Sequence, residues 1–162
     1  MAEVLAGLRK ATSGSLIMNG EEITRTAVKA RIGRGISFIP EDRLKMGLIP
    51  GMNMTENAVL KDFKSRACSR GGILRRKAIR ALTEGYIKEH EIKHGGLNLP
   101  VGLMSGGNQQ KLLVAREING NPALIIAAYP VRGLDIGATA AIHRTLLEQR
   151  AAGACVILIS EE

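Results

Sequence analysis

A pair of glycines directly before a long helical pattern is the feature that most constrains this chain. Residues 103–111 read LMSGGNQQK, and the apolar residues Leu112, Leu113, Ala115 and Ile118 follow at helical spacing. The first four N–H groups of a helix have no partners within it, and the helix dipole places about half a positive charge at that end. The segment therefore predicts an anion-binding site at the start of a buried helix. A glycine turn before a core helix, without a ligand, is the alternative.

The residue types in this segment suit contact with an anion. Ser105 can cap the helix with its hydroxyl group, and Gly106 and Gly107 allow a ligand to approach the backbone closely. Gln109 and Gln110 add neutral hydrogen-bond donors without a negative charge that would repel the ligand.

The composition fits one globular domain built around a parallel sheet. The chain has 162 residues, of which 45% are hydrophobic and only 2% aromatic, so its core must consist of aliphatic side chains. No apolar run approaches the roughly 20 residues that span a bilayer, so we expect any membrane contact to go through a partner. The net charge of +8 favours anionic partners but does not select one.

The two cysteines do not have the spacing of zinc ligands. Cys155 lies in the apolar run ACVILI at 154–159, and Cys68 stands alone. A buried structural thiol, as expected in a reducing compartment, is therefore predicted.

The pattern along the chain alternates helices with short buried strands. Helices are predicted at 2–8, 26–32, from 55–57 onward, at 75–92, after the SGG segment and at 138–150. Strands are predicted at 35–40, 122–128 and 156–159, and residues 15–23 indicate a hairpin around Asn19-Gly20. Between 61 and 80 the chain is strongly basic, which predicts a surface that faces a partner. Phe63 is the one aromatic residue among these charges, and the lack of a series of interleaved aromatic residues argues against base stacking there.

Three motifs in this order resemble those of a known family. PEDR at 40–43, SGGNQQK at 105–111 and RGLD at 132–135, with an apolar strand after Asn121-Pro122, resemble the ATP-binding cassette (ABC) ATPases. PEDR and SGGNQQK together are similar to the ATP-binding subunits of bacterial sugar and nucleoside importers, which carry two cassettes in tandem. The second cassette is the better match, and the resemblance covers nearly the whole chain.

The resemblance implies a P-loop NTPase fold. We expect an α/β core with a mostly parallel sheet and an antiparallel edge arm, formed by residues 1–43 and 105–162, and a helical subdomain inserted at 44–104. No GxxxxGK[ST] phosphate-binding loop occurs in the sequence. We therefore expect the chain to be a fragment that starts just after that loop and is cut at both ends.

The resemblance also implies that the chain lacks the hydrolytic residues of the family. The strand before Ala128 normally ends in an aspartate that holds Mg²⁺ through water, followed by a glutamate that polarises the attacking water. Here the two positions are Ala128 and Tyr129, and neither a methyl group nor a phenol with a pKa of about 10 performs those roles. Glu41 stands in place of the Q-loop glutamine, with a solvated salt bridge inside PEDR as the alternative. Glu161 stands in place of the histidine that contacts the γ-phosphate.

What the chain keeps is the half of the site that one cassette gives to the other. By resemblance, the signature residues cradle the γ-phosphate of an ATP held with Mg²⁺ mainly by the partner cassette: Ser105, Gly106, Gly107, Asn108 and Gln109. Asp135 occupies the D-loop position that faces the partner cassette. An N-cap of the following helix is an equally good role for Asp135, and the two roles are compatible.

The function implied is that of the energy-coupling, ATP-binding component of an importer for sugars or nucleosides. Its partners would be a second cassette, transmembrane permease subunits and, indirectly, a periplasmic or lipoprotein solute-binding protein, which places it in the cytoplasm at the inner face of the membrane. The chain alone is not expected to hydrolyse ATP. A nucleic-acid-associated ABC module and a purely structural half are the alternatives. The order of the motifs argues against the first and the intact signature against the second, so no specific nucleic acid is expected.

Overall fold

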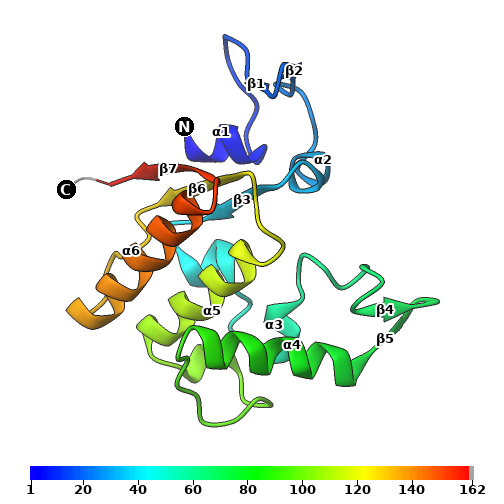
Figure 1. The fold of residues 1–162 in the computed structure, drawn as a ribbon, viewed down its shortest axis with the longest axis vertical. Coiled ribbons are helices and arrows are strands. Elements are labelled where there is room, and N and C mark those ends of the chain that lie inside the picture. Colours follow the sequence, from blue (N-terminus) through cyan, green and yellow to red (C-terminus); the bar gives the residue numbers. More distant parts are fainter. Residues whose placement is uncertain (161–162) are drawn as a thin grey trace. The chain divides into compact units, whose positions relative to one another are not determined.

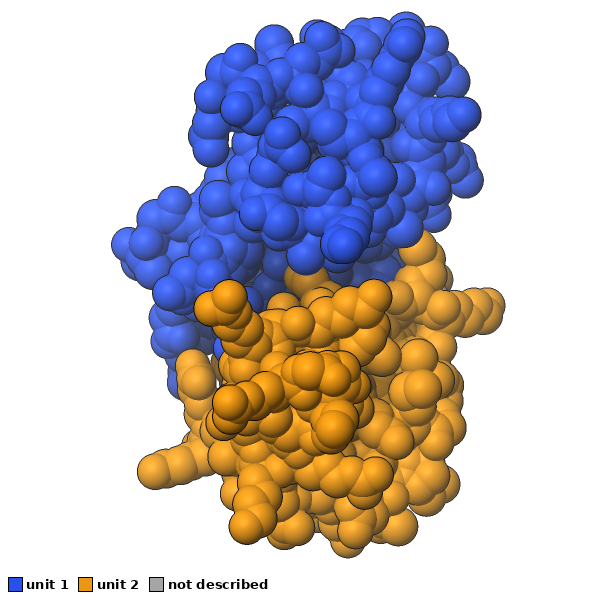
Figure 2. Space-filling view, turned by 90° about the vertical axis from the view of Figure 1, so that its right-hand side faces the viewer, with its two compact units in different colours: residues 1–41, 117–130, 143–162 blue, residues 42–116, 131–142 orange. Residues whose placement is uncertain are grey.

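A three-stranded parallel sheet is the centre of the first of two compact units in the computed structural model (Figure 1). The structure describes residues 1–160, and unit 1 comprises residues 1–41, 117–130 and 143–162 (Figure 2). Its strands β3 (Ile36–Ile39), β6 (Leu124–Ala128) and β7 (Cys155–Ile159) lie in the order β3-β6-β7. Leu124 pairs with Ile36 on one side and with Cys155 on the other. The central strand is buried, as the apolar run at 122–128 predicts.

An antiparallel hairpin and two short helices complete the ordered elements of unit 1 that precede β3. They are α1 (Ala2–Ala6), β1 (Ile17–Met18), β2 (Glu21–Glu22) and α2 (Val28–Gly33). Asn19 and Gly20 both have positive φ, at 51° and 82°, which is the geometry of a two-residue hairpin turn. The predicted hairpin and the mixed α/β class with a parallel sheet are therefore confirmed.

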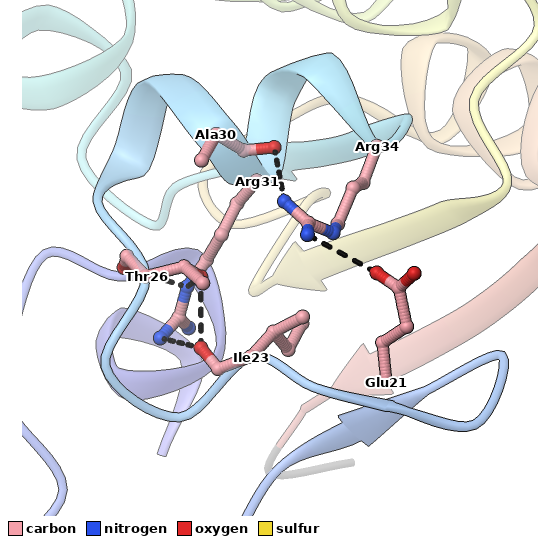
Figure 3. Close-up of polar contacts among 6 residues, drawn as sticks. All are labelled: Glu21, Ile23, Thr26, Ala30, Arg31 and Arg34. Carbon is pink, nitrogen blue, oxygen red and sulfur yellow. Dashed lines mark hydrogen bonds and ion pairs between the residues drawn. The ribbon is translucent and has the colours of Figure 1, made fainter.

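Arg31 in α2 joins the parts of this region (Figure 3). Its guanidinium donates to the carbonyls of Val4 and Leu5 at 2.6 and 2.7 Å, at the end of α1, and to those of Ile23 and Thr24 at 2.9 Å. The residue is only 2% exposed, and its burial lowers the pKa of the guanidinium. Arg31 thus gives the carbonyls of Leu5 and Thr24 a donor and adds a further one to those of Val4 and Ile23, which also accept backbone N–H groups.

Unit 2 is mainly helical and comprises residues 42–116 and 131–142. It contains a π-helical turn (Arg43–Gly47), α3 (Met54–Ala58), a hairpin of β4 (Ser69–Arg70) and β5 (Ile73–Leu74), α4 (Arg76–Glu89) and a 3₁₀ turn (Val101–Leu103). α5 (Gly106–Ile118) lies in unit 2 up to Arg116, and α6 (Ile136–Ala151) lies in it up to Ile142. The fully buried Met54, Val101, Leu112 and Leu113 belong to its interior.

A buried amide fixes the start of this unit. Asn57 is fully buried, and its side chain accepts from the N–H of Ile49 and donates to the carbonyls of Ile49, Met52 and Asn53. Asn53 and Glu56 form a capping box, so α3 begins at Met54, one residue before the predicted start.

One sequence prediction about the core is wrong. Cys68 is buried, but Cys155 is exposed, because it is the first residue of β7 and lies at an end of the sheet. Within residues 1–160, no helix is long and apolar enough to cross a membrane.

Candidate functional site

The start of α5 presents backbone donors at an exposed loop. Ser105 is exposed, and its carbonyl accepts the N–H of Gln109 at 2.9 Å, which makes Ser105 the N-cap residue. In the described part of the chain, the N–H groups of Gly106, Gly107 and Asn108 have no backbone acceptor. The fully buried residues 112–114 hold the helix in place behind them. This arrangement has the polarity and access that an anion requires.

The side chains beside this loop orient it. Asn108 donates from Nδ2 to the Ser105 hydroxyl at 2.8 Å, and its Oδ1 accepts the N–H of Lys93 at 2.8 Å. Lys111 donates to the carbonyl of Glu91 at 3.2 Å. These residues line a shallow hollow together with Gly107 and the start of α6. Lys93 was missed by the sequence analysis, because it lies outside every motif.

Gly106 is explained by Arg43 of the PEDR motif. A Cβ atom at Gly106 would lie 2.6 Å from Nη2 of Arg43, so the guanidinium occupies the space of the missing side chain. The same guanidinium donates from Nε to Oε1 of Gln109 at 3.4 Å and from Nη1 to the carbonyl of Arg132 at 3.2 Å. Arg43 therefore links three motifs of unit 2 that are far apart in the sequence.

Gly107 faces the start of α6. A Cβ atom there would lie 3.1 Å from Cβ of Ala138 and 3.7 Å from Oδ2 of Asp135. Asp135 accepts the N–H of Ala138 on Oδ1 at 2.8 Å, and its carbonyl accepts the N–H of Thr139. The predicted N-cap role of Asp135 is thus confirmed, and its exposed Oδ2 lies next to the signature glycine.

The two signature glutamines do not lie as the sequence analysis expected. Gln109 is 4% exposed, and its amide nitrogen donates to the carbonyls of Val101 and Met104 at 3.1 and 3.0 Å. Gln110 is 2% exposed. The Gln109 amide thus gives the part-buried carbonyl of Met104 a donor and adds a second donor to the carbonyl of Val101, which also accepts the N–H of Met104. Both side chains therefore point into the fold rather than toward a ligand, and Gln109 holds the loop from behind.

The PEDR turn is held by local hydrogen bonds. Asp42 accepts the N–H groups of Leu44 and Lys45 at 3.2 and 3.0 Å and pairs with the Lys45 ammonium at 3.4 Å. The hydrogen bond from the Lys45 backbone is the main reason that the pKa of Asp42 lies below its usual value. Glu41 is exposed at the entry to this turn.

The end of β6 carries no group that could organise a metal ion. Ala128 is buried, and Tyr129 follows it with a φ of +47° and donates its N–H to the carbonyl of Ile159 at 2.8 Å. In residues 1–160 there is no group of three or more His, Cys, Asp or Glu side chains placed to hold a metal. The methyl group of Ala128 and the phenol of Tyr129 are not carboxylate ligands, so these two residues do not fit Mg²⁺ at this strand end. Glu161 lies outside the described residues.

Known proteins match the chain over its whole length. It is 37% identical to a glucose import ATP-binding protein of Haloferax volcanii and 38% identical to a guanosine import ATP-binding protein of Bacillus subtilis. It is 35% identical to a ribose import ATP-binding protein of Jannaschia sp.. Each match covers 100% of this chain but only 30%, 32% and 31% of the relative, so the chain spans about a third of the length of these proteins.

Solved structures agree on the fold. A dimeric ATP-binding cassette bound to ADP and Pi superposes with a TM-score of 0.77 at 24% identity, covering 99% of this chain and 68% of that one. A nucleotide-free cassette of an ABC transporter gives 0.75 at 18% identity, with 99% and 64% covered. The family model described as ABC transporter matches residues 1–131. With the cassette fold and the exposed donor loop at the start of α5, these matches show that the chain belongs to the ABC transporter family of ATP-binding proteins.

Proposed function

We propose that this chain is the second, non-hydrolysing cassette of an importer's ATP-binding subunit and that it gives its signature loop to an ATP held by a partner cassette. The observation that carries the proposal is the start of α5, where Ser105 is exposed, Gly106 and Gly107 are half-buried, and the N–H groups of Gly106, Gly107 and Asn108 have no backbone acceptor. Donors fixed in this way can bind the γ-phosphate without reorganising as charge develops on it.

The chain's own residues prepare this contact. Gln109 holds the loop through the carbonyls of Val101 and Met104, and Asn108 orients the Ser105 hydroxyl. Asp135 occupies the position of the D-loop and leaves Oδ2 exposed beside Gly107, where a partner cassette would meet it. Direct contact of the Gln109 side chain with ATP has no support in this conformation, and its role in the proposal is to position the backbone.

The proposal that the chain's own nucleotide site does not hydrolyse ATP rests on the end of β6. A buried methyl at 128 and a tyrosine at 129 supply neither a ligand for Mg²⁺ nor a base for water at neutral pH. Glu41, which stands in place of the Q-loop glutamine, also supports a site that does not hydrolyse ATP. The partner cassette would hold the nucleotide and its Mg²⁺, so hydrolysis would occur in one composite site.

The relatives support a proposal for the cargo and the remaining partners. Glucose, guanosine and ribose import proteins share this sequence at 35–38% identity, which favours a sugar or a nucleoside as the cargo. We propose transmembrane permease subunits as direct partners and a solute-binding protein as an indirect one, which places the chain at the cytoplasmic face of the membrane. We further propose that residues 44–104 form the helical subdomain and that residues 1–43 with 105–162 form the partial ABC ATPase core.

Steady-state ATPase assays of this chain assembled with a partner cassette that has an intact phosphate-binding loop test the proposal. Gly107→Asp should reduce the rate about a hundredfold or more, because its carboxylate would block and repel the γ-phosphate, and losing the contact of backbone donors with a developing anion costs on the order of 3 kcal/mol. Tyr129→Ala should have little effect, because no catalytic base is lost. Intact activity in Gly107→Asp together with loss in Tyr129→Ala would overturn the proposal.

A second pair of variants separates blocked ligand access from damaged packing. A Cβ at Gly107 would press against Ala138 at 3.1 Å, so Gly107→Ala alone disturbs unit 2. Gly107→Ala combined with Ala138→Gly removes that contact. Ala138→Gly alone is the stability reference, because a glycine within α6 costs about 0.5–1 kcal/mol by itself. If activity stays low in the double variant while its unfolding midpoint is no lower than that of Ala138→Gly, the loss comes from the ligand side of the loop.

A further inference from the structure

The β4–β5 hairpin and the segments beside it carry almost the whole net charge of the chain. Eight of the 23 basic residues and only one of the 15 acidic residues lie between 61 and 80. The segment therefore has a charge of +7, out of +8 for the chain. Arg66, Arg70, Arg76 and Lys77 are exposed and have no ion pair within residues 1–160. Like charges crowded in this way favour an anionic partner.

Exposed apolar side chains stand among these charges. Ile73 is 76% exposed, Leu74 47% and Phe63 45%. The hairpin projects beyond the start of α4 in Figure 1. We define the basic hairpin as residues 63–77, a surface that combines free cations with aliphatic and aromatic groups.

The basic hairpin is an ordered element. Ser69 pairs with Leu74 and Arg70 with Ile73, across a turn in which Gly71 and Gly72 have φ values of 58° and 82°. At its base the N–H of Arg75 donates to the carbonyl of Cys68 at 2.8 Å, and Cys68 packs with Val59 and Ile79 in a small core. The exposed apolar groups are therefore held at the surface by the fold.

We propose that the basic hairpin binds an anionic lipid surface, with Ile73 and Leu74 entering the headgroup region and the arginines and lysines contacting lipid phosphates. Aliphatic side chains such as Ile73 and Leu74 partition into a bilayer interface, whereas they cannot stack on nucleic acid bases. The one aromatic ring of the surface, Phe63, has the Lys64 ammonium over it, 5.5 Å from its centroid, and a single ring gives no series of stacking platforms. The inference rests on the proposed function, which places the chain at the cytoplasmic side of the membrane. The cytoplasmic leaflet is negatively charged and would attract the basic hairpin. Cytoplasmic loops of membrane proteins carry an excess of Lys and Arg, and the basic hairpin would repel them.

Vesicle sedimentation with the 162-residue chain tests the inference. Vesicles of phosphatidylcholine with phosphatidylglycerol should bind the chain, and vesicles of phosphatidylcholine alone should not. Each Lys or Arg near an anionic surface contributes about fivefold to the partition coefficient, so Arg70→Glu with Arg76→Glu should lower it about 30-fold or more. A chain that does not bind the anionic vesicles would overturn the proposal.

Matched variants distinguish the basic hairpin from the overall charge. Lys10→Glu with Arg25→Glu changes the charge equally at two exposed positions of unit 1 and should leave most of the binding intact. If both charge reversals weaken binding equally, the attraction is diffuse and the hairpin is not a site. Ile73→Ser with Leu74→Ser should weaken the binding that remains at high salt, whereas Leu8→Ser with Ile17→Ser, also exposed, should not.

Two further results complete the test. If a DNA or RNA duplex binds through Arg70 and Arg76 at physiological salt more tightly than the vesicles do, the partner is a nucleic acid and the lipid proposal is wrong. No nucleotide or partner cassette is present in the vesicle assay. Loss of vesicle binding therefore refutes this inference alone, and an insensitive Gly107→Asp ATPase refutes the proposed function alone.

Discussion

The contact between Arg43 and Gly106 makes a sharp prediction about stability. Gly106 lies in α5 with a helical backbone, so alanine fits its conformation, but the new Cβ would lie 2.6 Å from Nη2 of Arg43. The guanidinium must move, and its hydrogen bonds to Gln109 at 3.4 Å and to the carbonyl of Arg132 at 3.2 Å are then lost. At about 0.5–1.5 kcal/mol net for each bond, the loss is about 1–2 kcal/mol, because the first bond is long and the second is exposed.

The effect of Gly106→Ala on the free energy of unfolding should change sign when Arg43 is replaced by alanine. Replacing a glycine by alanine in a compatible conformation stabilises a protein by about 0.4–1 kcal/mol through the unfolded state. In an Arg43→Ala background nothing opposes that gain, so Gly106→Ala should become neutral or stabilising. Urea unfolding of the four proteins should therefore give a coupling free energy of about 1–3 kcal/mol.

A third glycine supplies the control for this cycle. Gly85 lies inside α4, and a Cβ there would have no other atom within 4 Å. Gly85→Ala should stabilise the chain by about 0.5–1 kcal/mol with or without Arg43. If Gly106→Ala has the same effect in both backgrounds, or if Gly85→Ala couples to Arg43 as strongly, the reasoning about the guanidinium is refuted.

Three further measurements test other parts of the structure. Gln109→Ala should lower the free energy of unfolding by about 1–3 kcal/mol, because the part-buried carbonyl of Met104 loses the amide donor and that of Val101 keeps only the N–H of Met104; a urea titration that shows no change would contradict this. In the native chain a thiol reagent should modify Cys155 rapidly and Cys68 only after urea unfolding; equal rates would be inconsistent with their burial. Because the folded pKa of Asp42 is lowered, its stabilising contribution is present above the ordinary aspartate pKa and is lost as the pH falls through the folded value. The difference in urea midpoint between the parent and Asp42→Asn should therefore shrink on acidification, and a difference that grows would contradict that sign.

The strands and long helices could be predicted because their side chains follow the periodicity of the fold. The runs at 122–128 and 156–159 are apolar without interruption and the run at 35–40 is interrupted only by Ser37, a pattern typical of strands in a parallel sheet, and β3, β6 and β7 lie within these runs or one residue from them. The β4–β5 hairpin was missed because Ser, Arg, Ile and Leu in two-residue strands show no alternation. Its only signal was the Gly71-Gly72 pair, which a two-residue turn with positive φ at both positions favours.

The site was predictable at its centre and not around it. Ser105 and the glycines were recognisable because a cap followed by glycines before an apolar helix is a local pattern. The Gln109 side chain points into the fold because its amide donates to the carbonyls of Val101 and Met104. These carbonyls come within reach of the amide only when the preceding loop folds back on the helix. The contact of Arg43 with Gln109 spans 66 residues, and no periodicity in the sequence encodes it.

The two signature glycines are constrained by the chain's own packing as well as by a ligand. Arg43 fills the space beside Gly106, and Ala138 closes the space beside Gly107. A loss of activity after substitution of either glycine therefore has two possible physical origins within unit 2. The clash can be relieved by removing the opposing side chain while the new Cβ is kept. The substitution that does this is Arg43→Ala for Gly106 and Ala138→Gly for Gly107. The ATPase activity that is still missing after the clash is relieved measures how strongly the new Cβ disturbs the contact with the phosphate.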